Sequence, residues 1–365
     1  MQSQNNLTSN PQLIAMVHIP CASALAYSRY SALCGVDTYT SDELKILDEC
    51  RIQLSDLSKT IIKESGNELF IYCRNASFVL KENEITILEN KIRSLHFVQK
   101  LIDRALHEVE IYQRHGIQII ELENIGAPYF IGNEIPLEEL LILLVIGKSI
   151  RAKFPEIQMG IQVLSCGELE ALPIAIACNA FFVRSEASLY KGLRPEGETN
   201  NRGNLAKFYY LRNYLTTKFG ALQSEGRTLP ALWCDLQKKH TLFSTELNHL
   251  DVWLTPILFQ KIEGVILTGS ETGKDVDEHA LKQARLFLNE LDKKMIQIFG
   301  RILNHKIPLI TGSGANIEVY AKYADYIIVG TAFKKNNYWE NVVDEAAVKT
   351  LLGRFSKIKN HVETE

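Results

Sequence analysis

Residues 307–332 read IPLITGSGANIEVYAKYADYIIVGTA. Two short apolar runs, at 307–312 and 326–331, flank a segment at 317–323 whose apolar residues have helical spacing. A strand, a turn signal, a helix and a second strand in this order form one repeat of an α/β protein. This stretch therefore predicts strands that are connected by helices.

The same alternation extends through the rest of the chain. Apolar, β-branched runs recur, and each is followed by a turn signal and an amphipathic stretch. The predicted strands are residues 13–20, 117–124, 157–164, 180–185, 229–236, 264–269, 307–312 and 326–331. The predicted helices cover residues 97–109, 136–154, 168–178, 204–219, 275–304 and 317–323. Eight such units favour a (β/α)8 TIM barrel, and a doubly wound α/β sheet is the alternative because strand number alone does not prove closure.

The first unit is longer than the others. Roughly 100 residues separate its two strands, where about 30 suffice. We predict a small α+β insertion at 30–95, with a helical pattern and a β-hairpin at 69–73 and 78–88. The barrel then comprises residues 12–29 and 96–355, with flexible tails at 1–11 and 356–365. An insertion after the first strand is placed to act as a lid over the barrel mouth, and a packing or oligomerisation module fits equally well.

The composition is that of a globular protein, with 46% hydrophobic and 23% charged residues. Forty Lys and Arg against 43 Asp and Glu leave a net charge of -3, which argues against nucleic acid as a partner. No apolar run approaches the roughly 20 residues of a membrane-spanning helix, and the first residues lack the features of a targeting peptide. The seven cysteines form no C-x-x-C pair, so we expect reduced thiols. We expect a cytoplasmic protein that binds a small ligand and no membrane.

Polar side chains close most of the predicted strands. The polar residues at these ends are His18, Glu121, Glu123, Asn124, Gln162, Arg184, Glu186, Asp235, Thr268 and Ser270. In a barrel the C-terminal strand ends converge on one site, so we expect these residues to form a pocket. Each of them also has a structural interpretation, as a cap or as a buried hydrogen-bonding group.

Two carboxylates in this set have a spacing of their own. Glu121 and Glu123 are two residues apart in a strand and therefore share a face, opposite Leu122. Such a pair suits acid–base chemistry or a divalent cation. Asp235 adds a second group of this kind, with a lysine and a histidine in the loop that follows. We predict four catalytic residues, Glu123, Asp235, Lys239 and His240. No spacing identifies a metal or another cofactor, and a divalent cation is the open option.

Glycine clusters follow the last three predicted strands. Where a residue lacks Cβ, a phosphate can approach the backbone N–H groups closely. The predicted phosphate-binding residues are Gly269, Ser270, Gly312, Ser313, Gly314, Gly330 and Thr331, with Lys334 and Lys335 as supplements. Turns that need a positive φ are the alternative reason for these glycines. Residues 269–274 are not a Walker A loop, because three residues separate the glycines and Asp275 replaces the required Ser or Thr.

These segments together resemble the BtpA family, which comprises photosystem I biogenesis proteins and SgcQ-like proteins. The segments that match its motifs are MVHIP at 16–20, ENIGAPY at 123–129, DLQKKH at 235–240, TGSETG at 268–273, GSG at 312–314 and VGTAFK at 329–334. The resemblance covers residues 12–30 and 96–355. The sequence departs from the family pattern at Gln162, which replaces an Asn, at Gln237, which replaces a His, and after Gly126, where an Asp is missing.

The resemblance implies a TIM barrel akin to the ribulose-phosphate-binding barrels, and it brings no settled reaction. Together with the glycine clusters, it predicts a protein that binds a small phosphorylated metabolite at the C-terminal face of the barrel. We expect an enzyme, of the lyase, isomerase or hydrolase type. A non-catalytic ligand-binding protein or an assembly or stability factor on the same barrel is the alternative.

Overall fold

The structure is a computed structural model of the chain. The described residues are 11–20, 42–43, 45–46, 68–73, 76–125, 135–164, 166–186, 189–190, 192–194, 197–198, 204–218, 229–236, 241–242, 257, 261–269, 274–299, 306–312 and 316–362.

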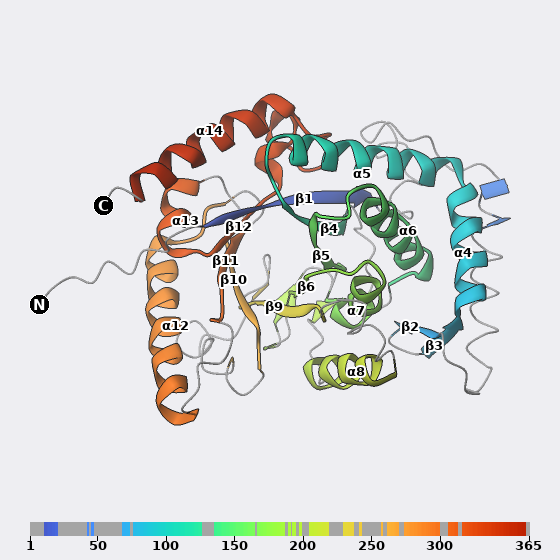
Figure 1. The fold of residues 1–365 in the computed structure, drawn as a ribbon, viewed down its shortest axis with the longest axis horizontal. Coiled ribbons are helices and arrows are strands. Elements are labelled where there is room, and N and C mark those ends of the chain that lie inside the picture. The colour runs from blue at the N-terminus through green and yellow to red at the C-terminus, as the bar shows by residue number, and fades with distance from the viewer. Residues whose placement is uncertain are drawn as a thin grey trace, which may run out of the picture.

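Eight strands close into a parallel barrel (Figure 1). They are β1 (Gln12–Pro20), β4 (Ile119–Ile125), β5 (Gln158–Gln162), β6 (Phe182–Ser185), β9 (Ala231–Asp235), β10 (Gly264–Thr268), β11 (Leu309–Gly312) and β12 (Tyr326–Val329). Their order around the barrel is β1-β12-β11-β10-β9-β6-β5-β4, and β1 pairs with both β4 and β12. The predicted TIM barrel is confirmed, with a strand at each of the eight predicted places, and the doubly wound alternative is wrong.

Helices surround the strands. They include α5 (His96–Arg114), α6 (Leu137–Lys153), α7 (Glu168–Ala177), α8 (Asn204–Lys218), α12 (Glu278–Phe299), α13 (Ile317–Tyr323) and α14 (Glu345–Val362). Short elements are β7 (Leu193–Arg194), β8 (Gly197–Glu198), η2 (Thr331–Phe333) and η3 (Lys335–Asn337). Helix α14 was not predicted, and it continues to Val362, inside the segment that we expected to be a tail. None of the helices in the described part of the chain is long and apolar enough to cross a membrane.

The described part of residues 30–95 lies outside the barrel. It contains an antiparallel hairpin, β2 (Glu68–Cys73) and β3 (Ala76–Lys81), followed by α4 (Glu82–Ser94). The prediction of a strand over 78–88 is wrong in its second half, where α4 begins. Helix α4 packs on α6, where Glu89 pairs with Lys148 at 2.6 Å and Arg93 donates to Ser149 at 2.7 Å. The extent of the insertion and its role as a lid or an oligomerisation module stay predictions.

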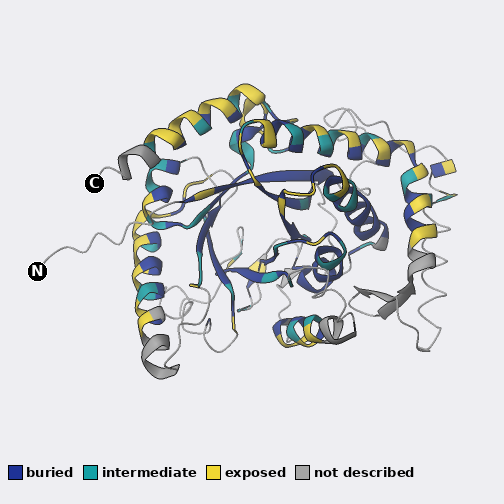
Figure 2. Cartoon of the chain, viewed as in Figure 1, coloured by how far each residue is buried: buried dark blue, intermediate teal, exposed yellow. Residues whose placement is uncertain are grey.

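Apolar side chains form two clusters on opposite sides of the barrel wall. The larger cluster lies between the strands and the helices, and the smaller one fills the barrel interior. The buried members of the interior cluster are Ile14, Met16, Ile119, Phe182, Trp233, Ile266, Ile310 and Ile328. Figure 2 shows buried strands within helices that expose their outer faces. Because side chains alternate along a strand, every second residue of each strand points to the barrel axis.

Two stacked aromatic rings lie among the aliphatic side chains of the lower interior. The rings of Phe182 and Trp233 stack with centroids 3.9 Å apart. Two strand glycines make room for them, since a Cβ at Gly160 would lie 2.0 Å from the Phe182 ring and one at Gly264 would lie 2.3 Å from Trp233. A glycine inside a strand often marks such a close approach. These rings form a floor on which the polar residues of the upper interior rest.

The aromatic floor predicts a steric defect for a single added methyl group. Gly160→Ala should lower the free energy of unfolding by about 1–3 kcal/mol, because the new Cβ overlaps the Phe182 ring. Adding Phe182→Leu in the same chain should recover part of that loss. The measurement is urea unfolding, with Gly353→Ala on exposed α14 as the control, since nothing lies within 4 Å of its Cβ. Equal effects of the two alanine variants would contradict this packing.

Candidate functional site

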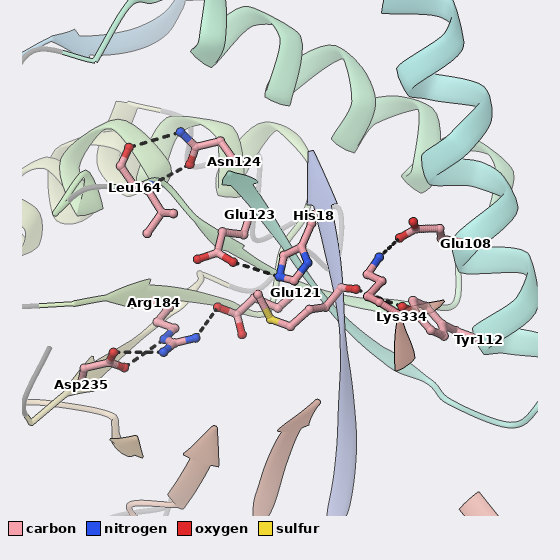
Figure 3. A network of polar contacts seen from close by, with 11 residues as sticks. His18, Glu108, Tyr112, Glu121, Glu123, Asn124, Leu164, Arg184, Asp235 and Lys334 are labelled. Atoms are coloured by element: carbon pink, nitrogen blue, oxygen red, sulfur yellow. Dashed lines mark hydrogen bonds and ion pairs between the residues drawn. The ribbon is translucent and has the colours of Figure 1, made fainter. Parts of the chain in front are cut away.

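The upper interior of the barrel is polar. On β4, Ile119 belongs to the interior cluster and Leu122 to the outer one, so Glu121 and Glu123 both point inward. The strand register places His18 next to Glu123, and Glu123 next to Gln162. Figure 3 shows His18, Glu121 and Glu123 with their partners from close by. The predicted shared face of the two glutamates is therefore present, and it faces the axis.

Arg184 links three strands across the interior (Figure 3). Its Nε and Nη2 donate to the two carboxylate oxygens of Asp235 at 2.9 and 3.0 Å, which is a bidentate pair. Its Nη1 donates to Oε1 of Glu121 at 3.3 Å. All three residues are buried. Asp235, predicted to be catalytic, is thus engaged by Arg184 through both oxygens, which suits a positioning role more than that of a free base.

Burial and the neighbouring charges shift the pKa values of Glu121 and Arg184. Removal from water raises the pKa of Glu121 to about 7, with Glu123 and Asp235 adding to the rise and Arg184 opposing it. Burial alone would lower the pKa of Arg184, but Asp235 and Glu121 hold that pKa well above its ordinary value. Glu121 therefore exchanges a proton near neutral pH beside a guanidinium that stays charged.

His18 and Glu123 form a second polar pair, two residues further along β4 than Glu121. Nε2 of His18 lies 3.3 Å from Oε2 of Glu123, and both side chains are about nine-tenths buried. Nδ1 of His18 is also buried and finds no partner among the described residues. A neighbouring imidazole and carboxylate are the usual components of proton transfer in enzymes. His18 and Glu123, brought together from β1 and β4, therefore form the best acid–base candidate in the described barrel.

Two other predicted pocket residues, Gln162 and Asn124, lie on opposite faces of the barrel wall. Gln162 points inward with 1% of its surface exposed, and its Oε1 has no partner within the described residues. Asn124 instead joins two strand ends, since its amide donates to the carbonyl oxygen of Leu164 at 3.2 Å and accepts from the Leu164 N–H at 2.7 Å. Gln162 thus belongs to the interior site, whereas Asn124 acts as a structural link between β4 and the loop after β5.

The predicted phosphate glycines have different surroundings. Gly312 and Gly330 continue the inward-facing positions of β11 and β12, and a Cβ at Gly330 would lie 3.2 Å from His18. Gly269 instead packs on the backbone, because its Cβ would lie 2.1 Å from the carbonyl oxygen of Lys274. None of these three has a positive φ, which removes the alternative explanation for them. Thr331 opens η2.

Five predicted site residues lie outside the described residues: Lys239, His240, Ser270, Ser313 and Gly314.

Lys334 does not supplement a phosphate site. Its side chain is fully buried, and Nζ pairs with Glu108 of α5 at 2.7 Å. Tyr112, one turn further along α5, donates to the carbonyl oxygen of Met16 on β1 and packs against Phe333. These contacts fasten the segment after β12 to α5, next to β1 (Figure 3). No sequence signal reveals them, because the paired residues are 226 positions apart.

No three His, Cys, Asp or Glu side chains in the described ranges converge closely enough to hold a metal ion. The predicted option of a divalent cation at the glutamate pair stays a prediction.

A profile of the BtpA family matches residues 92–357. The chain belongs to the BtpA family. Relatives of this BtpA-family chain include an uncharacterised mitochondrial protein of Caenorhabditis elegans, 27% identical over 72% of this chain and 85% of the relative. An uncharacterised protein of Archaeoglobus fulgidus is also 27% identical, over 69% of this chain and 88% of its own length.

Solved structures similar to this BtpA-family chain are distant. N-(5'-phosphoribosyl)anthranilate isomerase from Pyrococcus furiosus is 14% identical with a TM-score of 0.38, over 69% of this chain and 94% of that one. A 7,8-dihydropteroate synthase from Vibrio fischeri is 15% identical with a TM-score of 0.35, over 71% and 86%. Barrels of this kind host many unrelated reactions, so these similarities leave the reaction of the present barrel open.

The pKa of Glu121 predicts a pH dependence of folding. Because the folded-state pKa of about 7 exceeds the roughly 4.3 of an exposed glutamate, the folded protein binds more protons between these values. The free energy of unfolding should therefore be highest at the acid end of this window and fall as the pH rises to about 7. Glu121→Gln should flatten this part of the profile and raise the free energy of unfolding at pH 8 by up to about 3 kcal/mol.

The measurement is urea unfolding at several pH values. Glu110→Gln, which replaces a half-exposed glutamate on α5, should keep the slope of the native protein. A slope that persists in Glu121→Gln would assign the titration to another group.

Proposed function

We propose that this protein binds a small phosphorylated metabolite at the C-terminal end of the barrel and catalyses a proton transfer on it. The observation that carries the proposal is the inward-facing His18–Glu123 pair, which lies over the buried Arg184 network. Proton transfer is a step common to lyases, isomerases and hydrolases, the classes in which we expect the reaction.

Roles follow from these contacts. Glu123 and His18 exchange the proton with the ligand, because they form the upper pair and the imidazole retains an uncommitted nitrogen. Arg184 and Asp235 act as positioning residues, since their bidentate pair fixes the guanidinium that holds Glu121. Lys239 and His240, in the loop after β9, keep their predicted catalytic roles within the proposal.

The phosphate group would bind at the ends of β11 and β12, the second of which is the neighbour of β1 and its His18. Gly312 and Gly330 present only backbone to the axis, and they begin the loops in which barrels commonly hold phosphate. Strand β11 lies across the barrel from β5 in the strand order, so a ligand held at Gly312 would extend toward Gln162. This arrangement brings the carbon skeleton of the ligand between the loops and the acid–base pair.

Phosphate binding is tested by thermal unfolding. Inorganic phosphate at millimolar concentration should raise Tm, because it binds only the folded state. Thr331→Glu should abolish that increase by placing a carboxylate beside the anion. Thr350→Glu on α14 is the control, since it adds the same charge to an exposed helix away from the strand ends. If phosphate still raises the Tm of Thr331→Glu, the anion binds at a place other than η2.

Catalysis is tested on the metabolites that copurify with the native protein, identified by mass spectrometry. Turnover of such a metabolite by Glu123→Gln should have a kcat reduced at least about 100-fold, because a general acid or base contributes that much. The increase in Tm caused by phosphate should persist in this variant. Glu110→Gln should leave kcat unchanged. Binding without turnover in the native protein would favour the alternative, a non-catalytic ligand-binding or assembly factor.

A further inference from the structure

Three buried polar atoms in the upper interior have no partner among the described residues. They are Nδ1 of His18, Oε2 of Glu121 and Oε1 of Gln162. The exposed fractions of these residues are 7%, 0% and 1%. A buried polar atom without a hydrogen bond costs folding free energy, and a binding site is a common reason for its presence.

The three atoms come from three neighbouring strands and face the same axis. Register pairs His18 with Glu123, and Glu123 with Gln162, while Glu121 lies two residues below on β4. Neighbouring strands are about 4.8 Å apart and alternate residues about 7 Å apart, so the patch measures roughly 10 Å by 7 Å.

The chemistry of the three atoms is also shared. The amide oxygen of Gln162 accepts hydrogen bonds, as does the unpartnered Oε2 of Glu121 when that carboxyl group is ionised. When Nε2 of His18 donates its proton to Glu123, Nδ1 is left as a bare acceptor. A ligand that satisfies all three must therefore present several hydrogen-bond donors along one side.

We propose that the ligand is a phosphorylated polyol or sugar whose hydroxyl groups donate to His18, Glu121 and Gln162. This inference rests on the proposed function for the phosphate half of the ligand and adds the chemistry of the other half. The patch favours hydroxyl groups over an ammonium group, because the amide oxygen of Gln162 is uncharged and Arg184 already pairs with both Asp235 and Glu121.

The experiment compares two phosphate esters with the same five-carbon chain. Ribitol 5-phosphate carries hydroxyl groups along that chain, whereas pentyl phosphate carries none. By isothermal titration calorimetry the native protein should bind ribitol 5-phosphate at least about tenfold more tightly, which two or more hydrogen bonds supply. Similar affinities for the two esters would overturn the inference.

Substitutions test whether Gln162 causes the preference for ribitol 5-phosphate. Gln162→Met should reduce the preference for ribitol 5-phosphate at least about threefold and leave the affinity for inorganic phosphate within about twofold. Gln162→Asn, which keeps the amide on a shorter side chain, is the second variant if the methionine variant does not fold. Thr311→Val is the matched control, because Oγ1 of Thr311 is also buried without a partner in the described residues. Thr311 alternates with the inward-facing Ile310 and Gly312, so its side chain points away from the barrel axis. This control should keep the full preference.

The outcomes separate this inference from the proposed function. Tight binding of inorganic phosphate and of both esters, with no effect of Gln162→Met, would overturn the hydroxyl assignment and leave the phosphate site standing. Binding of unphosphorylated ribitol that depends on Gln162, without any binding of inorganic phosphate, would support the hydroxyl patch and overturn the phosphate site. If 5-aminopentyl phosphate binds more tightly than ribitol 5-phosphate, the patch recognises an ammonium group, and the hydroxyl assignment is overturned. If no probe binds, both proposals are overturned.

Discussion

One buried cation makes the polar interior of this barrel compatible with folding. Arg184 is the only charged donor that the described hydrogen bonds place between Glu121 and Asp235, and it contacts both. Ions in a protein interior lose their hydration, and that cost is offset only by close pairing with good geometry. The fork of the guanidinium meets this condition toward Asp235, while Glu121 is held by a single contact. The unequal pairing leaves one carboxylate oxygen of Glu121 available. Burial, which the contact with Arg184 opposes only in part, raises the pKa of Glu121 to about 7.

The aromatic floor determines where this polar group lies. Phe182 and Trp233 fill the interior below Arg184 and Asp235, each one inward-facing position earlier on the same strand. The bulk of both rings is accommodated only because Gly160 and Gly264 face them. Polar side chains are thereby confined to the C-terminal half of the interior. A ligand entering from that end meets the His18–Glu123 pair before it meets the rings.

Local patterns were sufficient for the strands and for most helices, because burial on both faces imposes continuous apolar runs and helices keep their amphipathic spacing. They failed over residues 78–88, where a strand passes directly into α4 without a glycine or proline to mark the boundary. The shared face of Glu121 and Glu123 was predictable, since alternation along a strand is local. The burial of Lys334 was not, because its partner Glu108 becomes a neighbour only when the barrel closes.

The sequence by itself determined the βα order of this protein, its eight strands, the polar character of the strand ends and its membership of the BtpA family. Each of these depends on residues near one another in the chain. Only the tertiary structure decided which polar groups share the interior and how they are paired: Asp235 with Arg184, His18 with Glu123, and Gln162 with no described partner. The physical reason is that the register between distant strands selects the neighbours of a side chain, and burial among those neighbours sets its charge and its free hydrogen-bonding capacity.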